Sequence, residues 1–235
     1  MLLSGLSVTW LGHGTFLLVS PEGRRILIDP WLDGNPSCPP AFRKIDKVDL
    51  ILVTHGHFDH VHDAVTVAKA TGAIVVGIFE LCDWLANKGV TTASGMNKGG
   101  TQEQCGVRIT MVDARHSSSY VDDGVVTYLG EAAGYVLRFG NGLTVYFAGD
   151  TSVFGDMRLI RELYSPSIAF LPIGDFFTMD PSAAAKAVEL LGVRKVIPMH
   201  YGTFPVLTGR PEQLRELVAP LGVEVVEMQP GQTLA

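Results

Sequence analysis

Residues 53–63, VTHGHFDHVHD, place four of the chain's seven histidines and two aspartates directly after an apolar stretch. Residues i and i+2 of an extended chain project to the same side, so His55 and His57 can reach one cation. Asp59 and His60 come where we expect a helix to begin, and they suit a second cation beside the first. Carboxylates and neutral imidazoles are the usual ligands of zinc and its neighbours. The stretch therefore predicts a metal site.

Each residue of this stretch also has an ordinary interpretation. Asp59 can be a helix cap, which is a position that Asp favours, and any single histidine can be a solvated turn residue. The ordered set of His-x-His-x-Asp-His after an apolar strand favours the metal site. We interpret His62, two residues farther on, as a surface histidine, and we expect Gly56 to provide an unusual backbone conformation between the two histidines.

Three later residues stand in the same context, where an apolar run leads into a polar side chain. They are His116 in "TMVDARHSS", Asp150 in "TVYFAGDT" and His200 in "KVIPMH". Taken singly, the histidines fit a core or a strand end and the aspartate fits an Asx turn. Taken together, they complete two cation sites: His55, His57 and His116 for one ion, Asp59, His60 and His200 for the other, with Asp150 as a bridge.

Short apolar runs rich in β-branched residues recur along the chain, and several are continuous, as in strands covered on both faces. The predicted strands lie in residues 24–30, 48–55, 72–78, 107–114, 132–140, 143–150, 167–174, 194–200 and 223–228. Helices are predicted at 59–72, 180–192 and 210–222, with Asp180 as a cap and Gly192 as a stop. This mixture predicts α/β or α+β layers. Both halves contain a strand that leads into a polar cluster and a helix, so we expect the two clusters to face each other.

The 235 residues are 47% apolar and 18% charged, with no linker that would split them, and predict one domain over 1–235. The net charge of −6 and the lack of a basic stripe argue against a nucleic-acid partner. Three scattered cysteines indicate no disulfide framework and favour a cytoplasmic location. No apolar run approaches the roughly 18 residues that a membrane span needs.

The ordered motifs "LIDP", "THGHFDH", "ARH", "AGDT" and "PMH" resemble the metallo-β-lactamase superfamily over the whole chain. The stretches "WLGHGTFLL", "LIDPWLDGNP" and "IPMHYGTFP" are similar to a family of metal-dependent hydrolases near the L-ascorbate-6-phosphate lactonase branch. The resemblance implies an αββα four-layer sandwich with metals at one edge. It also implies that Asp29 steadies the histidine loop from behind the ligands, as oriented ligands require.

We therefore expect a hydrolase in which two divalent cations activate a water molecule toward a small ester, lactone or phosphoester-type substrate. Asp59 is the expected catalytic residue, which orients the water or passes its proton to the leaving group. Zinc is the preferred metal, with manganese or iron as alternatives.

Other functions remain open on the sequence. They are a mononuclear iron dioxygenase on the same fold, a nuclease, which the acidic charge disfavours, and a non-enzymatic metal-binding protein. The expected partner is a small molecule, with no nucleic acid and no membrane, and homo-oligomerisation is open. His13, Lys98 and Tyr201 are candidate pocket residues, and each of them also fits a purely structural position.

Overall fold

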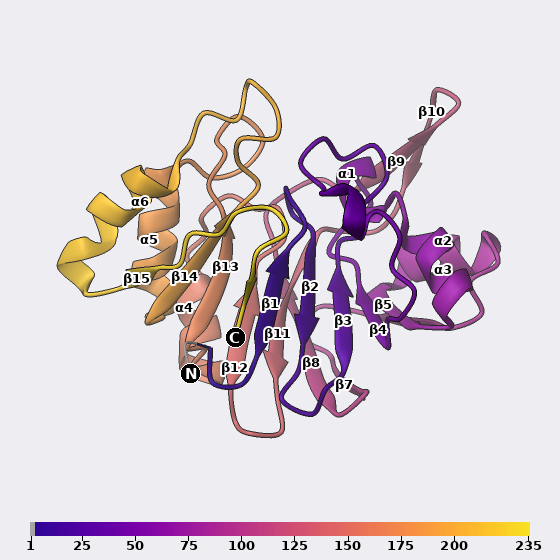
Figure 1. Cartoon of the computed structure of the whole chain (residues 1–235), viewed down its shortest axis with the longest axis horizontal. Helices are drawn as coiled ribbons and strands as arrows, with labels where there is room; N and C mark the ends of the chain where they lie inside the picture. The colour runs from indigo at the N-terminus through magenta and orange to yellow at the C-terminus, as the bar shows by residue number, and fades with distance from the viewer. Residues whose placement is uncertain (1–2) are drawn as a thin grey trace.

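Two seven-stranded mixed sheets lie face to face in the computed structural model of the chain, which describes residues 3–235 (Figure 1). The first sheet has the order β16-β1-β2-β3-β4-β5-β6. Strands β16, β1, β2 and β3 pair antiparallel, whereas β3 to β6 run parallel. Its strands are β1 (Ser7–Trp10), β2 (Phe16–Val19), β3 (Arg25–Ile28), β4 (Leu50–Leu52), β5 (Ile74–Ile78), β6 (Ala93–Met96) and β16 (Thr233–Leu234).

The second sheet has the order β15-β14-β13-β12-β11-β8-β7 and repeats this division. β7, β8, β11 and β12 pair antiparallel, and β12 to β15 run parallel. Its strands are β7 (Thr101–Gln104), β8 (Val107–Asp113), β11 (Ala133–Arg138), β12 (Thr144–Phe147), β13 (Ile168–Pro172), β14 (Lys195–Met199) and β15 (Glu224–Val225).

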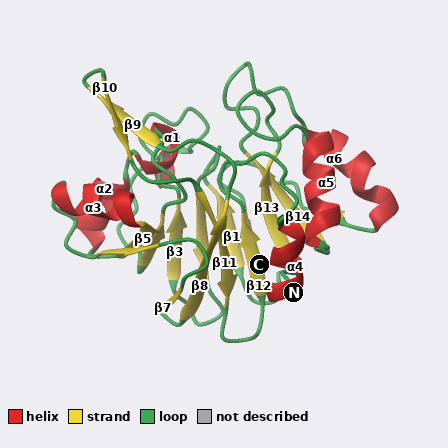
Figure 2. Cartoon of the chain, turned by 180° about the vertical axis from the view of Figure 1, so that it is seen from behind, coloured by secondary structure: helices red, strands yellow, loops and turns green. Residues whose placement is uncertain are grey.

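Helices cover the outer faces of both sheets (Figure 2). The first sheet carries α2 (Ala64–Thr71) and α3 (Phe79–Asn87), which contact β5. The second carries α4 (Met157–Tyr164), α5 (Pro181–Leu191) and α6 (Pro211–Val218). Single turns form α1 (Phe58–Val61) and the 3₁₀ helices η1 (Pro40–Phe42) and η2 (Ala219–Leu221). The predicted four-layer αββα sandwich is confirmed.

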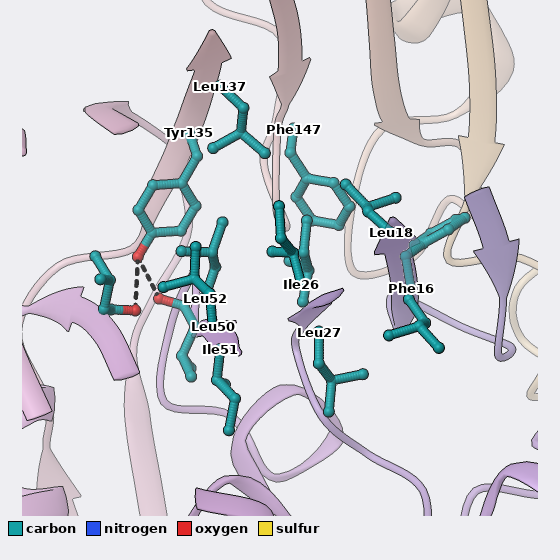
Figure 3. Close-up of a cluster of buried hydrophobic side chains, with 14 of the residues drawn as sticks. Phe16, Leu18, Ile26, Leu27, Leu50, Ile51, Leu52, Tyr135, Leu137 and Phe147 are labelled. Carbon is teal, nitrogen blue, oxygen red and sulfur yellow. Dashed lines mark hydrogen bonds between the residues drawn. The ribbon is translucent and has the colours of Figure 1, made fainter. Parts of the chain in front are cut away.

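The main core fills the space between the two sheets. In Figure 3, Phe16, Ile26 and Leu52 of the first sheet meet Leu137 and Phe147 of the second, and all five are fully buried. A second apolar cluster lies between the second sheet and its helices. Both faces of the central strands are therefore covered, which explains why their sequences are continuously apolar.

A cross-sheet hydrogen bond joins the core to the segment that holds the site. The buried Tyr135 hydroxyl on β11 donates to the carbonyl oxygen of Val53, at 2.7 Å, directly after β4 (Figure 3). The histidine run begins two residues later, so the second sheet fixes the position from which that run departs.

The predicted helix at 59–72 is wrong in one respect, because it is broken at His62 and Asp63 into α1 and α2. The buried carboxylate of Asp63 accepts hydrogen bonds from the backbone N–H of Leu32, at 2.6 Å, and of Asp33, at 3.0 Å. This anchor to a distant loop requires a turn at Asp63, and α1 is thereby separated from α2. The helix at 180–192 forms with the expected Asp180 cap, which accepts from Ala183 N at 2.7 Å.

The sequence did not predict the two-stranded hairpin of β9 (Ser119–Asp122) and β10 (Val125–Tyr128), which projects beside α1 (Figure 1). Among the described residues, none of the helices combines the length and the apolar character that a bilayer crossing requires.

Candidate metal centre

The predicted site residues all come from segments that leave strands at one edge of the sandwich. His55, His57, Asp59 and His60 follow β4 of the first sheet. The other three follow strands of the second sheet, namely β8 for His116, β12 for Asp150 and β14 for His200. Strands β8, β12 and β14 run in the same direction, so their carboxyl ends meet at the same edge.

Three histidines form the first group. Nε2 of His55 lies 3.0 Å from Nδ1 of His57, and that Nδ1 lies 3.2 Å from Nε2 of His116. Burial, followed by the proximity of His60, holds the pKa of His55 well below its ordinary value. Burial also lowers the pKa of His57 and of His116. The three imidazoles are therefore neutral at pH 7 and present lone pairs to one point, which suits a cation.

A carboxylate and two histidines form the second group. Asp59 Oδ2 lies 3.8 Å from Nε2 of His60 and 3.7 Å from Nε2 of His200. Both histidines are buried, while the Asp59 side chain is 14% exposed and is thus the member of this group that faces the open side.

Asp150 lies between the two groups. Its Oδ2 is 3.4 Å from His60 Nε2 and 3.0 Å from His200 Nε2, in the second group. The same oxygen is 3.7 Å from His116 Nε2, in the first. All seven side chains that the sequence singles out are therefore brought together, and the aspartate stands where a bridging carboxylate is expected.

The residues at the centre fit a bound cation. Nε2 of His60, Nε2 of His200 and Oδ1 of Asp150 are buried and make no well-oriented hydrogen bond among the described residues, although Asp150 Oδ2 lies 3.0 Å from Nε2 of His200. Burial lowers the pKa of His60, but the carboxylates of Asp150, Asp29 and Asp59 reverse this and hold that pKa well above its ordinary value. The cluster thus gathers negative charge in a buried place, where a proton or a metal ion must compensate it.

Asp29, at the end of β3, supports this arrangement from behind. Its carboxylate accepts from the backbone N–H and the hydroxyl of Thr54, both at 2.7 Å, and contacts His60 Nδ1 at 2.8 Å. Asp29 is fully buried. A hydrogen bond to one ring nitrogen fixes the orientation of an imidazole. The contact of Nδ1 with Asp29 therefore points Nε2 of His60 toward the centre of the site.

The glycine between the first two histidines serves a different purpose from the one expected. Gly56 does not have a positive φ. A Cβ at Gly56 would lie 2.7 Å from Cδ1 of Leu129, which leads out of the β9–β10 hairpin. Glycine is therefore required by the close approach of Leu129 rather than by an unusual backbone conformation.

His13 contacts the centre although the sequence offered only a weak indication of it. This fully buried residue lies in the turn between β1 and β2, with a φ of 56°. Its Nε2 is 2.9 Å from Asp59 Oδ2, and its Nδ1 is 3.0 Å from the hydroxyl of Thr203. The "GHG" turn was a visible signal, but a partner 190 positions away was not.

The other two candidate pocket residues differ in position, because Lys98 lines a pocket beside the site whereas Tyr201 packs against the core. Lys98 Nζ lies 2.6 Å from Asp113 Oδ1 and 2.9 Å from Glu131 Oε2, so it forms ion pairs instead of extending freely into solvent. Tyr201 packs against Trp10, with ring centres 5.2 Å apart. A pocket of about 410 Å³ adjoins the site and is lined by Lys98, Asp113, Ala114, Arg115, His116 and Glu131.

Comparisons with known proteins agree with this geometry. Residues 24–201 match the beta-lactamase superfamily domain. The chain is 54% identical over 231 residues to a UPF0173 metal-dependent hydrolase of Koribacter versatilis, covering 98% of each. It is also 54% identical to a UPF0173 metal-dependent hydrolase of Solibacter usitatus, covering 97% of this chain and 98% of the other. Among solved structures it is similar to Igni18, a metallo hydrolase from the archaeon Ignicoccus hospitalis, with 36% identity, a TM-score of 0.85 and 97% of each chain covered.

Proposed function

Because this chain belongs to the UPF0173 metal-dependent hydrolases of the beta-lactamase superfamily, we propose that it cleaves a small substrate at a pair of divalent cations. The substrate class is a small ester, lactone or phosphoester. His55, His57 and His116 would hold the first cation, Asp59, His60 and His200 would hold the second, and Asp150 would be shared between them. When bound, such cations polarise the scissile group and make water acidic enough to attack it near neutral pH.

One observation carries the proposal, namely the convergence of seven side chains that can bind a metal, with buried atoms at their centre that make no well-oriented hydrogen bond. Zinc suits a set of imidazoles and carboxylates, and manganese and iron are the alternatives. Asp59 is the carboxylate with catalytic reach, because its side chain is 14% exposed while that of Asp150 is 3% exposed. The proximity of His60 and a hydrogen bond from His13 hold the pKa of Asp59 below its usual range against the effect of burial. Asp59 is thus ionised and can orient water or carry a proton to the leaving group.

The decisive experiment joins metal analysis of the purified protein to an activity screen. We expect about two equivalents of metal per chain and turnover of at least one class among lactones, phosphodiesters and thioesters. Lactones are tested first, because the sequence resembles the L-ascorbate-6-phosphate lactonase branch. That resemblance stays a prediction. An oxygen-consumption assay with iron-loaded protein tests the dioxygenase alternative.

Removal of one imidazole from the first group provides the matched test. We expect His57→Ala to lose a metal equivalent and to reduce turnover by more than about 100-fold. Mutation of a residue that only supports a ligand already lowers metal affinity or activity by about 10–100-fold. His62→Ala is the control, because His62 lies in the same stretch but is exposed. Full activity in His57→Ala would refute the assignment.

A further inference from the structure

His13 contacts both halves of the second group of donors, although it is not one of the seven. Its Nε2 lies 2.9 Å from Asp59 Oδ2. Its carbonyl oxygen accepts from the backbone N–H of His200 at 3.1 Å and from the indole N–H of Trp10 at 3.0 Å. One residue of the β1–β2 turn therefore holds the carboxylate through its side chain and the histidine through its backbone.

The ring positions distinguish a hydrogen-bonding role from direct coordination. The three imidazoles of the first group have ring centres 4.6, 5.0 and 5.1 Å apart, which fits three rings that point at one ion. The ring centres of His13 and His200 are only 3.8 Å apart. Two rings bound to one cation at about 2.0–2.1 Å keep their centres roughly 4.5 Å or more apart. His13 thus packs against His200 rather than sharing an ion with it.

The hydrogen-bond partners of His13 define a single tautomer. Asp59 can only accept, so Nε2 of His13 carries the hydrogen. Nδ1 is then an acceptor, and the hydroxyl of Thr203 donates to it at 3.0 Å. Thr203 lies three residues after His200 in the segment that leaves β14, so this segment supplies both a candidate ligand and the group that sets the tautomer. For a neutral imidazole, no other hydrogen arrangement satisfies all three groups.

We propose that His13 is a positioning residue that fixes Asp59 and His200 around the second cation, through a chain running from Thr203 to His13 to Asp59. The inference rests on the proposed function, because it assigns a role toward the second of two cations. A hydrogen bond to one oxygen of a ligating carboxylate sets which lone pairs face the metal. His13 and His200 both have a positive φ, of 56° and 57°, so the contact is built on backbone conformations that ordinary residues rarely adopt.

The test is a cobalt titration of the full-length, metal-free protein, followed by visible absorbance and by competition with a chelator. We expect the wild type to bind two equivalents. His13→Ala retains the first with unchanged affinity and binds the second about 10–100-fold more weakly, which is the usual effect of losing a residue behind a ligand. His13→Gln is expected to recover most of the lost affinity for the second equivalent, because the amide N–H of glutamine can reach the position of the histidine Nε2.

A second pair of variants avoids any cavity at His13. Thr203→Val removes the hydroxyl but keeps the shape of the side chain, so we expect it to weaken the second equivalent, whereas Thr203→Ser retains it. His62→Ala serves as the histidine control. Circular dichroism and the thermal midpoint verify the fold of each variant.

Three outcomes would overturn this role. They are unchanged binding of both equivalents in His13→Ala, equal weakening of both equivalents, and equal loss of the second equivalent in His13→Ala and His13→Gln, which would make the imidazole itself a ligand. A wild type that binds fewer than two equivalents would contradict the proposed pair of cations instead, so the two failures are distinguishable.

Discussion

Side chains of the same type have opposite electrostatic states in the two halves of the site. Burial lowers the pKa of the first three histidines, and the nearby carboxylates of Asp59 and Asp150 oppose this effect without reversing it. Burial also lowers the pKa of His200, but the Asp150 carboxylate and the contact with Asp59 raise it to about 9. The first group is thus ready to bind a cation at pH 7, whereas the second holds protons that a cation must displace.

This difference predicts two distinct pH dependences for cation uptake. The first equivalent is expected to bind with little proton release at pH 7, because His55 is already neutral. The second is expected to release protons from His60 and His200, whose pKa values are both raised, so its affinity rises with pH across the neutral range and through the His200 pKa of about 9. Calorimetric zinc titrations in buffers with different ionisation enthalpies measure the protons released at each step. Equal proton release for both equivalents would contradict the assignment of the two groups.

Contacts between residues that lie far apart in the sequence could not be predicted from the sequence alone unless a local pattern marks each of them. The convergence of the seven side chains was predictable because each follows an apolar run that forms a strand, which is a local pattern. The contact of His13 with Thr203 depends on two loops 190 positions apart, and no local pattern reports it. Gly56 was identified as special, but the reason, the approach of Leu129, exists only in the folded chain.

At the scale of elements, periodicity and capping residues explain the successes and the failures. Every predicted strand range contains an observed strand, and α5 ends at Gly192 with a φ of 61° as expected. Helix α3 was missed because it starts directly after β5 at Phe79 without a capping side chain. The β9–β10 hairpin was missed because Val121, Val125 and Val126 are exposed, so its pattern follows no buried face.

The break between α1 and α2 makes a prediction about Asp63. Asp63→Ala leaves the backbone N–H groups of Leu32 and Asp33 without their partner, so we expect a loss of about 1–3 kcal/mol in the free energy of unfolding. Asp46→Ala is the control, since Asp46 is exposed in a surface pair with Lys44 and its loss is expected to change little. Urea unfolding measures both variants, and equal stability for both would refute the anchoring role.

At the scale of the whole molecule, the two sheets are joined through the core and through the site. Tyr135→Phe removes the hydroxyl that reaches from β11 to Val53 and leaves this buried carbonyl without its 2.7 Å bond. We expect a loss of about 1–2 kcal/mol in the free energy of unfolding. Tyr128→Phe, on an exposed residue of β10, is the matched control. A Tyr135→Phe variant as stable as the control in urea would show that the cross-sheet bond contributes nothing.

Cation binding is expected to clamp the two sheets, because four candidate ligands follow β4 of the first sheet and three follow strands of the second. The prediction of one domain over 1–235 then requires a single unfolding transition that zinc moves as a whole. At a free zinc concentration 100 times the dissociation constant, the stabilisation is about 2.7 kcal/mol. For a chain of this length, that raises the thermal midpoint by roughly 5–10 °C. Calorimetry with and without a chelator measures this shift, which is expected to fall in His57→Ala and to persist in His62→Ala. Two transitions, with only one sensitive to zinc, would mean that the sheets unfold separately and that the cations do not join them.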